Sequence, residues 1–133
     1  MRKLYRQTKT TTSLIHYHFV FCPRYRRKVF LIPGLETRFK ELVQEVCEEH
    51  EMEILAMECH KDHVHLFLSV LPQFSIPEIM QSIKGKTSRM LRMEFPELAK
   101  MPSLWTRSYF VSTAGNVSSK TIEWYVNTQK TRY

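Results

Sequence analysis

Two strand-like segments, 52–59 and 63–70, are joined by a short connection with a plausible tight turn at Lys61 and Asp62, and this feature restricts the fold more than any other. Two strands joined by so short a connection must pair as an antiparallel hairpin. Side chains alternate between the two faces of a strand, so the second segment, 63–70, presents one unbroken apolar row. That row consists of Val64, Leu66, Leu68 and Val70. The sequence therefore predicts an antiparallel sheet with one face turned towards a core.

The segments before and after this hairpin both show helical periodicity. Apolar residues at helical spacing predict helices over residues 35–50 and about 76–94. The second helix has a clear start, because Ser75 can cap it and Glu78 completes a capping box.

The remaining elements complete a recognisable order. Strands are predicted at 13–22 and 105–114, and a last helix, capped by Asn116 or Ser118, continues to about residue 130. The order β-α-β-β-α-β-α predicts an α+β protein with a ferredoxin-like (RRM-like) antiparallel sheet. In that fold the helices pack mainly on one face of the sheet, and the C-terminal helix is an addition.

The totals limit the kind of protein. The chain has 133 residues and a net charge of +7, which predicts a single domain over 1–133 with a polar N-terminal arm at 1–12. The positive charge favours a polyanionic partner such as nucleic acid. Its three cysteines are spaced without a CxxC motif, which is typical of reduced thiols. Together with the lack of a signal peptide or a long apolar run, this predicts a cytoplasmic protein that does not enter a membrane.

The second strand of the hairpin carries two histidines on the face opposite the apolar row. His63 and His65 point to the same side, roughly 6–7 Å apart at their Cα atoms, and can bind one divalent metal ion. An isolated H-x-H also arises easily by chance. The pair His16 and His18 in the first strand is interpreted as structural, because no partner for it is apparent from the sequence.

A second metal arrangement uses the same region. A structural zinc site is possible on ligand type alone, although its spacing across a turn would require strained geometry. Its four ligands would be Cys59, His60, His63 and His65.

The last helix carries a polar residue in an otherwise apolar line. Ile122, Tyr125, Val126 and Gln129 share one helix face, with Tyr125 and Gln129 one turn apart. One reading is a plain apolar face with the tyrosine in the core. Glutamine is a poor core residue, however, and its oxygen could serve beside two imidazoles as a metal ligand. The phenol would then lie next to the metal, where it could attack phosphorus.

These motifs together resemble a known family. His63-Val64-His65 resembles the HUH signature, and Tyr125 followed by Gln129 resembles the catalytic helix of single-tyrosine transposases. The segments HYHFVFCPRYRRKVF, EIMQSIKGKTSRML and WTRSYFVSTAGNVS resemble further parts of the same proteins. Over roughly residues 10–130 the chain is similar to the single-tyrosine (Y1) HUH transposases of the insertion-sequence 200/605 family.

The resemblance implies an activity and a site. The substrate would be single-stranded DNA with hairpins at the ends of a transposon, cut through a 5′-phosphotyrosine linkage to Tyr125. His63, His65 and Gln129 would hold Mg²⁺ or Mn²⁺. Each cut occupies one tyrosine, so two simultaneous cuts predict a homodimer. In that dimer, the resemblance adds, active sites can be shared between the chains.

Basic segments are the predicted DNA contacts. One is a loop in which a tyrosine can stack on a base while its neighbours hold phosphates, and the other lies along the middle helix. The predicted residues are Arg24, Tyr25, Arg26, Arg27, Lys28, Lys84, Lys86, Arg89 and Arg92.

Two other functions compete with this hypothesis. A non-catalytic module that binds single-stranded nucleic acid would need the basic surface but no tyrosine opposite a histidine pair. Another HUH-type DNA nickase would share the chemistry, but such chains usually carry further domains. A 2H-type phosphoesterase is excluded, because it requires two H-x-Ser/Thr motifs and the sequence has none.

Overall fold

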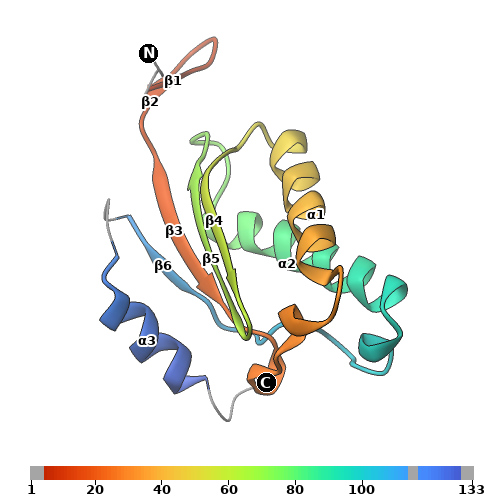
Figure 1. Cartoon of the computed structure of the whole chain (residues 1–133). Helices are drawn as coiled ribbons and strands as arrows, with labels where there is room; N and C mark the ends of the chain where they lie inside the picture. The colour runs from red at the N-terminus through yellow and green to blue at the C-terminus, as the bar shows by residue number, and fades with distance from the viewer. Residues whose placement is uncertain (1–4, 114–116, 130–133) are drawn as a thin grey trace.

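A four-stranded antiparallel sheet organises the protein, whose structure is a computed structural model that describes residues 5–113 and 117–129. The strand order is β4-β5-β3-β6. The bounds are His16–Phe21 for β3, Glu53–His60 for β4, His63–Ser69 for β5 and Phe110–Ser112 for β6. This is the order of a ferredoxin-like sheet, so the predicted fold class is confirmed (Figure 1). The hairpin of β4 and β5 turns at Lys61 and Asp62, as predicted.

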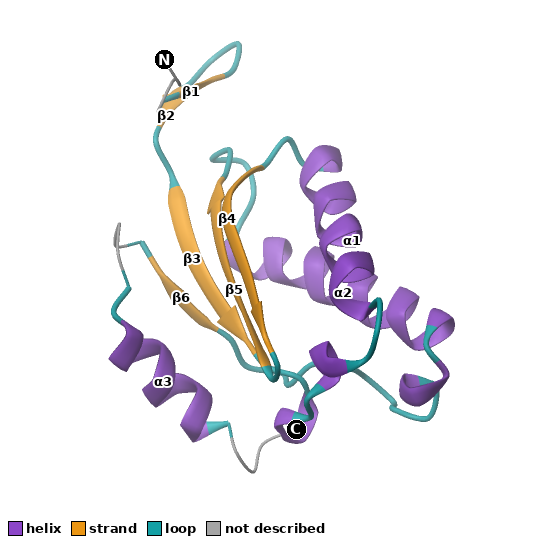
Figure 2. Cartoon of the chain, in the orientation of Figure 1, coloured by secondary structure: helices purple, strands orange, loops and turns teal. Residues whose placement is uncertain are grey.

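The helices divide between the two faces of this sheet. Helices α1 (Leu35–Glu49) and α2 (Ile76–Glu94) cover one face, and α3 (Ser119–Thr128) lies on the other (Figure 1, Figure 2). The capping box predicted at the start of α2 is present. The apolar row of β5 packs under α1 and α2 as part of the main core, together with Phe19 and Phe21. Val20 of β3 and Cys22, which follows the strand, face the other way and meet α3.

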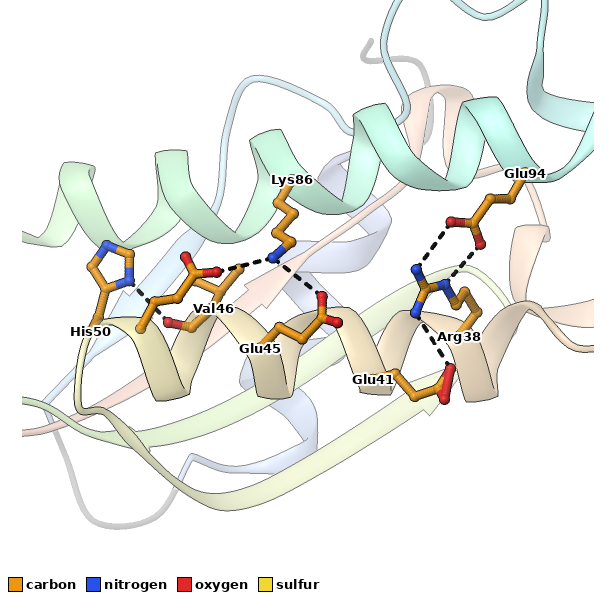
Figure 3. A network of polar contacts seen from close by, with 8 residues as sticks. Arg38, Glu41, Glu45, Val46, His50, Lys86 and Glu94 are labelled. Carbon is orange, nitrogen blue, oxygen red and sulfur yellow. Dashed lines mark hydrogen bonds and ion pairs between the residues drawn. The ribbon is translucent and has the colours of Figure 1, made fainter.

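Charged side chains join α1 and α2 above the core. Arg38 on α1 donates to both carboxylate oxygens of Glu94 on α2, at 2.8 and 3.1 Å. Lys86 on α2 reaches back to two glutamates of α1, Glu45 at 3.2 Å and Glu49 at 3.1 Å (Figure 3). The two helices are therefore linked at two points along their contact by ion pairs that are partly exposed.

The strand predicted over 105–114 is wrong in its extent. Of the described residues 105–113, only Phe110–Ser112 forms β6, which pairs with β3, and Ala114 lies outside the described residues. The preceding segment makes an isolated bridge between Trp105 and Pro23 instead. It leaves the sheet because the Trp105 side chain turns into the main core, where its indole N–H donates to Thr87 at 2.9 Å. Ser118 caps α3 as predicted, while the alternative cap Asn116 lies outside the described residues.

Short elements complete the chain. A small antiparallel hairpin, β1 (Arg6–Gln7) with β2 (Thr12–Ser13), extends beyond one end of the main sheet (Figure 1). It contains described residues of the predicted arm and also Ser13, which was predicted to begin the first strand; that strand begins at His16 instead. The 3₁₀ turns are η1 (Arg24–Arg26), η2 (Val29–Leu31) and η3 (Pro96–Leu98). Within residues 5–113 and 117–129, no helix combines the length and the apolar character that a membrane span requires.

Candidate active site

A cavity of about 480 Å³ lies between the exposed face of the sheet and α3. His63 and His65 on β5 line it together, so the structure places both histidines on one side of the strand, as the alternation predicts. From α3 the cavity receives side chains that include Ile122, Val126 and Asn127. The histidine strand and the tyrosine helix therefore form opposite walls of one space.

A buried carboxylate holds His63 from the turn that precedes it. The Nδ1 atom of His63 lies 3.0 Å from Asp62 Oδ1. Arg26 donates to the other oxygen of Asp62, from Nε at 3.1 Å and from a terminal nitrogen at 2.9 Å. On its open side, the His63 ring stacks against His60, with the ring centres 4.4 Å apart and the planes 11° from parallel. His63 is thus held both at one nitrogen and across its face.

A second histidine contact links β5 to the neighbouring strand. The Nδ1 atom of His18 on β3 lies 3.1 Å from Nε2 of His65, so one of the two rings donates a hydrogen bond to the other. His18 is buried and stacks on Phe67 at 4.0 Å. The sequence predicted no partner for His18, because the partner depends on the register between β3 and β5. In that register His18 lies opposite Phe67 and Val20 lies opposite His65, so the two histidines are diagonal neighbours.

Burial controls the protonation of these groups. Burial lowers the pKa of His63 below its ordinary value, although the hydrogen bond to Asp62 partly opposes this. Burial also lowers the pKa of His65, and the adjacent His18 adds to the effect. For Asp62, burial raises the pKa, but hydrogen bonds from His63 and Arg26 outweigh it and the net pKa is lowered. At neutral pH the site therefore combines two uncharged imidazoles with one ionised carboxylate, a state suited to metal binding.

The alternative four-ligand zinc site is not formed. Cys59 pairs with Val64 and packs towards the main core, whereas His60 pairs with His63 on the opposite face of the sheet. Alternation along β4 thus separates the sulfur from the imidazoles. In the part of the chain that the structure describes, no three residues among His, Cys, Asp and Glu are grouped so as to hold a metal ion.

Tyr125 and Gln129 meet each other through a serine that sequence reasoning missed. Ser108 Oγ lies 3.0 Å from the Tyr125 hydroxyl and donates to Gln129 Oε1 at 2.7 Å. A serine hydroxyl has one proton, so the Tyr125 hydroxyl is the donor in the first contact. The Gln129 amide nitrogen donates to Thr128, which fixes the orientation of the amide. Both predicted functional side chains of α3 are buried in this arrangement.

The histidine pair and the pair Tyr125 and Gln129 therefore lie beside different edges of α3. The edge with Ile122, Val126 and Asn127 faces the histidines, and the cavity lining does not include Tyr125 or Gln129. Tyr125 instead joins Val126 in a small apolar cluster with Val20 and Cys22. Within this chain, Gln129 is thus not brought beside His63 and His65.

The predicted DNA-binding residues fall into two groups. Several have partners inside the protein: Lys84 donates to the carbonyl oxygens of Thr106 and Ser108, and Arg92 donates to those of Ser88, Met101 and Pro102. Arg26 is bound to Asp62, and Lys86 to the glutamates of α1. Tyr25, Arg27, Lys28 and Arg89 are exposed.

The ninth predicted residue, Arg24, is half-buried and lines a small pocket together with two of the exposed residues. The pocket has a volume of about 280 Å³ and includes Arg24, Tyr25, Arg27 and Lys100 in its lining. Tyr25 is 53% exposed at this pocket, and an aromatic ring at the surface is a type of side chain on which bases stack.

Comparison with known proteins gives consistent matches. Residues 11–129 match the family described as Transposase IS200 like. The chain is 30% identical over 118 residues to the ISDra2 transposase TnpA of Deinococcus radiodurans, covering 86% of this chain and 84% of that protein. It is 36% identical over 117 residues to the Salmonella typhimurium transposase for insertion sequence element IS200, covering 85% of this chain and 75% of that protein.

Solved structures share the fold. A crystal structure of a Deinococcus radiodurans R1 protein assigned as a transposase superimposes with a TM-score of 0.84 at 27% identity, covering 93% of this chain and 97% of the other. The structure of a REP-associated tyrosine transposase bound to a REP hairpin gives a TM-score of 0.59 at 14% identity. That match covers 96% of this chain and 67% of the other, and it extends the likeness in fold alone.

Proposed function

This chain belongs to the IS200-like transposase family, and we propose that it cuts and rejoins single-stranded DNA at insertion-sequence ends through a 5′-phosphotyrosine intermediate. The observation that carries the proposal is the cavity between the His63–His65 pair and the helix that bears Tyr125. A module that only binds nucleic acid has no need for two uncharged histidines facing such a helix. The exposed basic residues around Tyr25 would hold the strand.

In the proposed cut, the phenol oxygen of Tyr125 attacks the scissile phosphorus and the bond from phosphorus to the 3′ oxygen breaks. The phenol loses its proton and the departing oxygen gains one, which leaves a 5′-phosphotyrosine and a free 3′-OH. A free tyrosine has a pKa of about 10 and is a weak nucleophile at neutral pH, so the phenol must be activated. The new linkage keeps the energy of the phosphodiester, and a second 3′-OH can rejoin the strand without ATP.

The histidine pair fits a divalent metal ion as two nitrogen ligands. Both rings line one cavity wall, and burial keeps both uncharged at neutral pH. Gln129 would complete a mixed nitrogen and oxygen set that suits Mn²⁺ or Mg²⁺. When bound, such an ion supplies Lewis-acid polarisation of the phosphate.

The position of Gln129 bears on assembly. Because Gln129 and Tyr125 are held at Ser108, they would reach a histidine pair only after α3 moves, or as part of a partner protomer. Two ends must be cut before strands are exchanged, and each protomer offers one such tyrosine. A homodimer whose protomers exchange tyrosine helices meets both requirements.

The test is formation of a covalent adduct with hairpin-bearing single-stranded DNA in the presence of Mn²⁺. We expect an adduct that maps to Tyr125 by mass spectrometry, and we expect it to disappear in excess EDTA, in Tyr125→Phe and in His63→Ala. Tyr5 is an exposed tyrosine that does not line the cavity, and it gives a matched control, since Tyr5→Phe should leave the adduct intact. Binding without any adduct would favour the non-catalytic module. An adduct on another tyrosine would refute the role of Tyr125.

Shared sites have their own test. A protein carrying His63→Ala and His65→Ala is mixed with Tyr125→Phe protein under conditions that allow subunits to exchange. If sites are shared, the mixed dimer holds one site with an intact histidine pair and an intact tyrosine, and some cleavage returns. If each site is built within one chain, both sites of the mixed dimer are defective and no cleavage is seen.

A further inference from the structure

Asp62 is a buried carboxylate that the proposed chemistry does not use. It lies in the turn between β4 and β5 and is 5% exposed. A buried carboxylate is costly unless hydrogen bonds and an opposite charge satisfy it. Here Arg26 occupies one oxygen with two N–H groups, and His63 occupies the other. Many residues can form a short surface turn, so the turn alone does not account for a buried aspartate that contacts both Arg26 and His63.

The geometry determines which nitrogen of His63 carries the proton. A carboxylate only accepts hydrogen bonds, so the Nδ1 atom of His63, 3.0 Å away, must be the donor. A neutral imidazole has one N–H group, and its Nε2 atom therefore keeps a free lone pair. Stacking against His60 restricts rotation of the same ring. His63 is thus held in one tautomer and one orientation with a nitrogen available as a ligand.

Arg26 is brought to Asp62 by an unusual stretch of backbone. Tyr25 and Arg26 have positive φ angles of 59° and 51°, a left-handed conformation that residues other than glycine rarely adopt. Such strain is unfavourable and persists only where the surrounding structure imposes it. From this loop Arg26 forms its ion pair with Asp62, at 2.9 Å. A second, longer contact of 3.4 Å joins Arg26 to Asn127 on α3.

We propose that Asp62 is a positioning residue that fixes the tautomer and orientation of His63 as a metal ligand, and that Arg26 holds the Asp62 carboxylate in place for this task. The inference rests on the proposed function, since it takes His63 as a ligand. Partners of this kind raise the affinity of a histidine for metal because the ring need not be reoriented on binding. Arg26 acts here within the protein rather than on a phosphate.

The first experiment reads the tautomer in protein free of metal and DNA. Long-range ¹H–¹⁵N correlation spectra at a pH where His63 is neutral should show a proton on Nδ1 and none on Nε2. In Asp62→Ala this preference should be lost, whereas Asp62→Asn keeps an accepting oxygen and should retain it. Glu58→Gln is the matched control, because it removes an exposed carboxylate from the same cavity and leaves the Asp62–His63 contact in place.

The second experiment measures Mn²⁺ affinity by electron paramagnetic resonance. We expect Asp62→Ala to bind Mn²⁺ about 10- to 100-fold more weakly than wild type. Asp62→Asn and Arg26→Gln should show smaller losses. Equal losses in Asp62→Ala and Glu58→Gln would mean that only the negative charge matters, and this would overturn the positioning role.

The outcomes separate the inference from the function beneath it. A wild-type protein with its His63 proton on Nε2 overturns the inference even if Asp62→Ala fails to fold. A wild-type protein that binds Mn²⁺ no better than Asp62→Ala overturns the inference and leaves the metal site standing. A wild-type protein that binds no Mn²⁺ refutes the metal site and the positioning role together, whatever the tautomer.

Discussion

Replacement of Ser108 by alanine tests whether this serine holds the tyrosine helix in the position seen here. Ser108 Oγ joins Tyr125 at 3.0 Å to Gln129 at 2.7 Å, and both partners are buried. Ser108→Ala removes both hydrogen bonds and leaves two polar atoms without this partner while α3 stays in place. The free energy that favours this position of α3 should therefore fall.

The size of the effect follows from the two contacts. A hydrogen bond contributes about 0.5–1.5 kcal/mol net, so two of them contribute about 1–3 kcal/mol. This corresponds to roughly a 5- to 150-fold shift in the equilibrium between the docked helix and the released helix. The apolar contacts of α3 with Val20 and Cys22 remain, so the rest of the fold should be unaffected.

Native-state hydrogen exchange measures that equilibrium directly. Amide protons of α3, including that of Val126, should exchange about 5- to 150-fold faster in Ser108→Ala, while those of β5 should not change. Ser103→Ala is the control, because this serine donates to a nearby carbonyl in the same region and is not among the contacts of α3. Unchanged exchange in α3, or equal acceleration throughout the protein, would refute the idea that Ser108 holds the helix. The tyrosine adduct should still form, since Ser108 is assigned no part in the chemistry.

Two further predictions concern charged groups. Burial lowers the pKa of Lys84 to about 8 from 10.5, so the unfolded chain binds more protons between these values and stability should rise with pH across that window. The free energy of unfolding of wild type relative to Lys84→Met, from urea titration, should increase from pH 8 to 10.5, and parallel curves would contradict it. In DNA binding followed by fluorescence anisotropy, Arg27→Ala should reduce the slope of log affinity against log salt by about 1. Lys86→Ala should not, because Lys86 is paired with Glu45 and Glu49, and equal slopes for both variants would argue against this division.

The sequence was sufficient for the features that short-range patterns determine. Alternation in 63–70 predicted both the core row and the shared face of His63 and His65, and the structure contains both. The capping box at Ser75 and the two-residue turn at Lys61 were predicted from neighbouring residues alone. Such features need no knowledge of which distant segments come together.

The rest depends on tertiary contacts. The last strand is short because Trp105 packs into the core, and β propensity does not contain that information. His18 meets His65 only through the register of β3 with β5, although the ferredoxin-like order already makes these strands neighbours. Asp62 gave one local signal, a carboxylate beside the histidine motif, but its burial and its partner Arg26 come from a strained loop that no pattern predicts.

The two functional elements are held with very different strength. β5 is an inner strand, bonded to β4 on one side and to β3 on the other, so the histidines stand on a strand that is hydrogen-bonded along both edges. Among the described residues, α3 packs through a small cluster of four buried residues and the contacts at Ser108. A strand-transfer enzyme has to keep the phosphate still while a nucleophile arrives, stays attached and leaves. Under the proposed function, that task favours metal ligands on an inner strand and the nucleophilic tyrosine on α3, the helix with the smaller packing cluster.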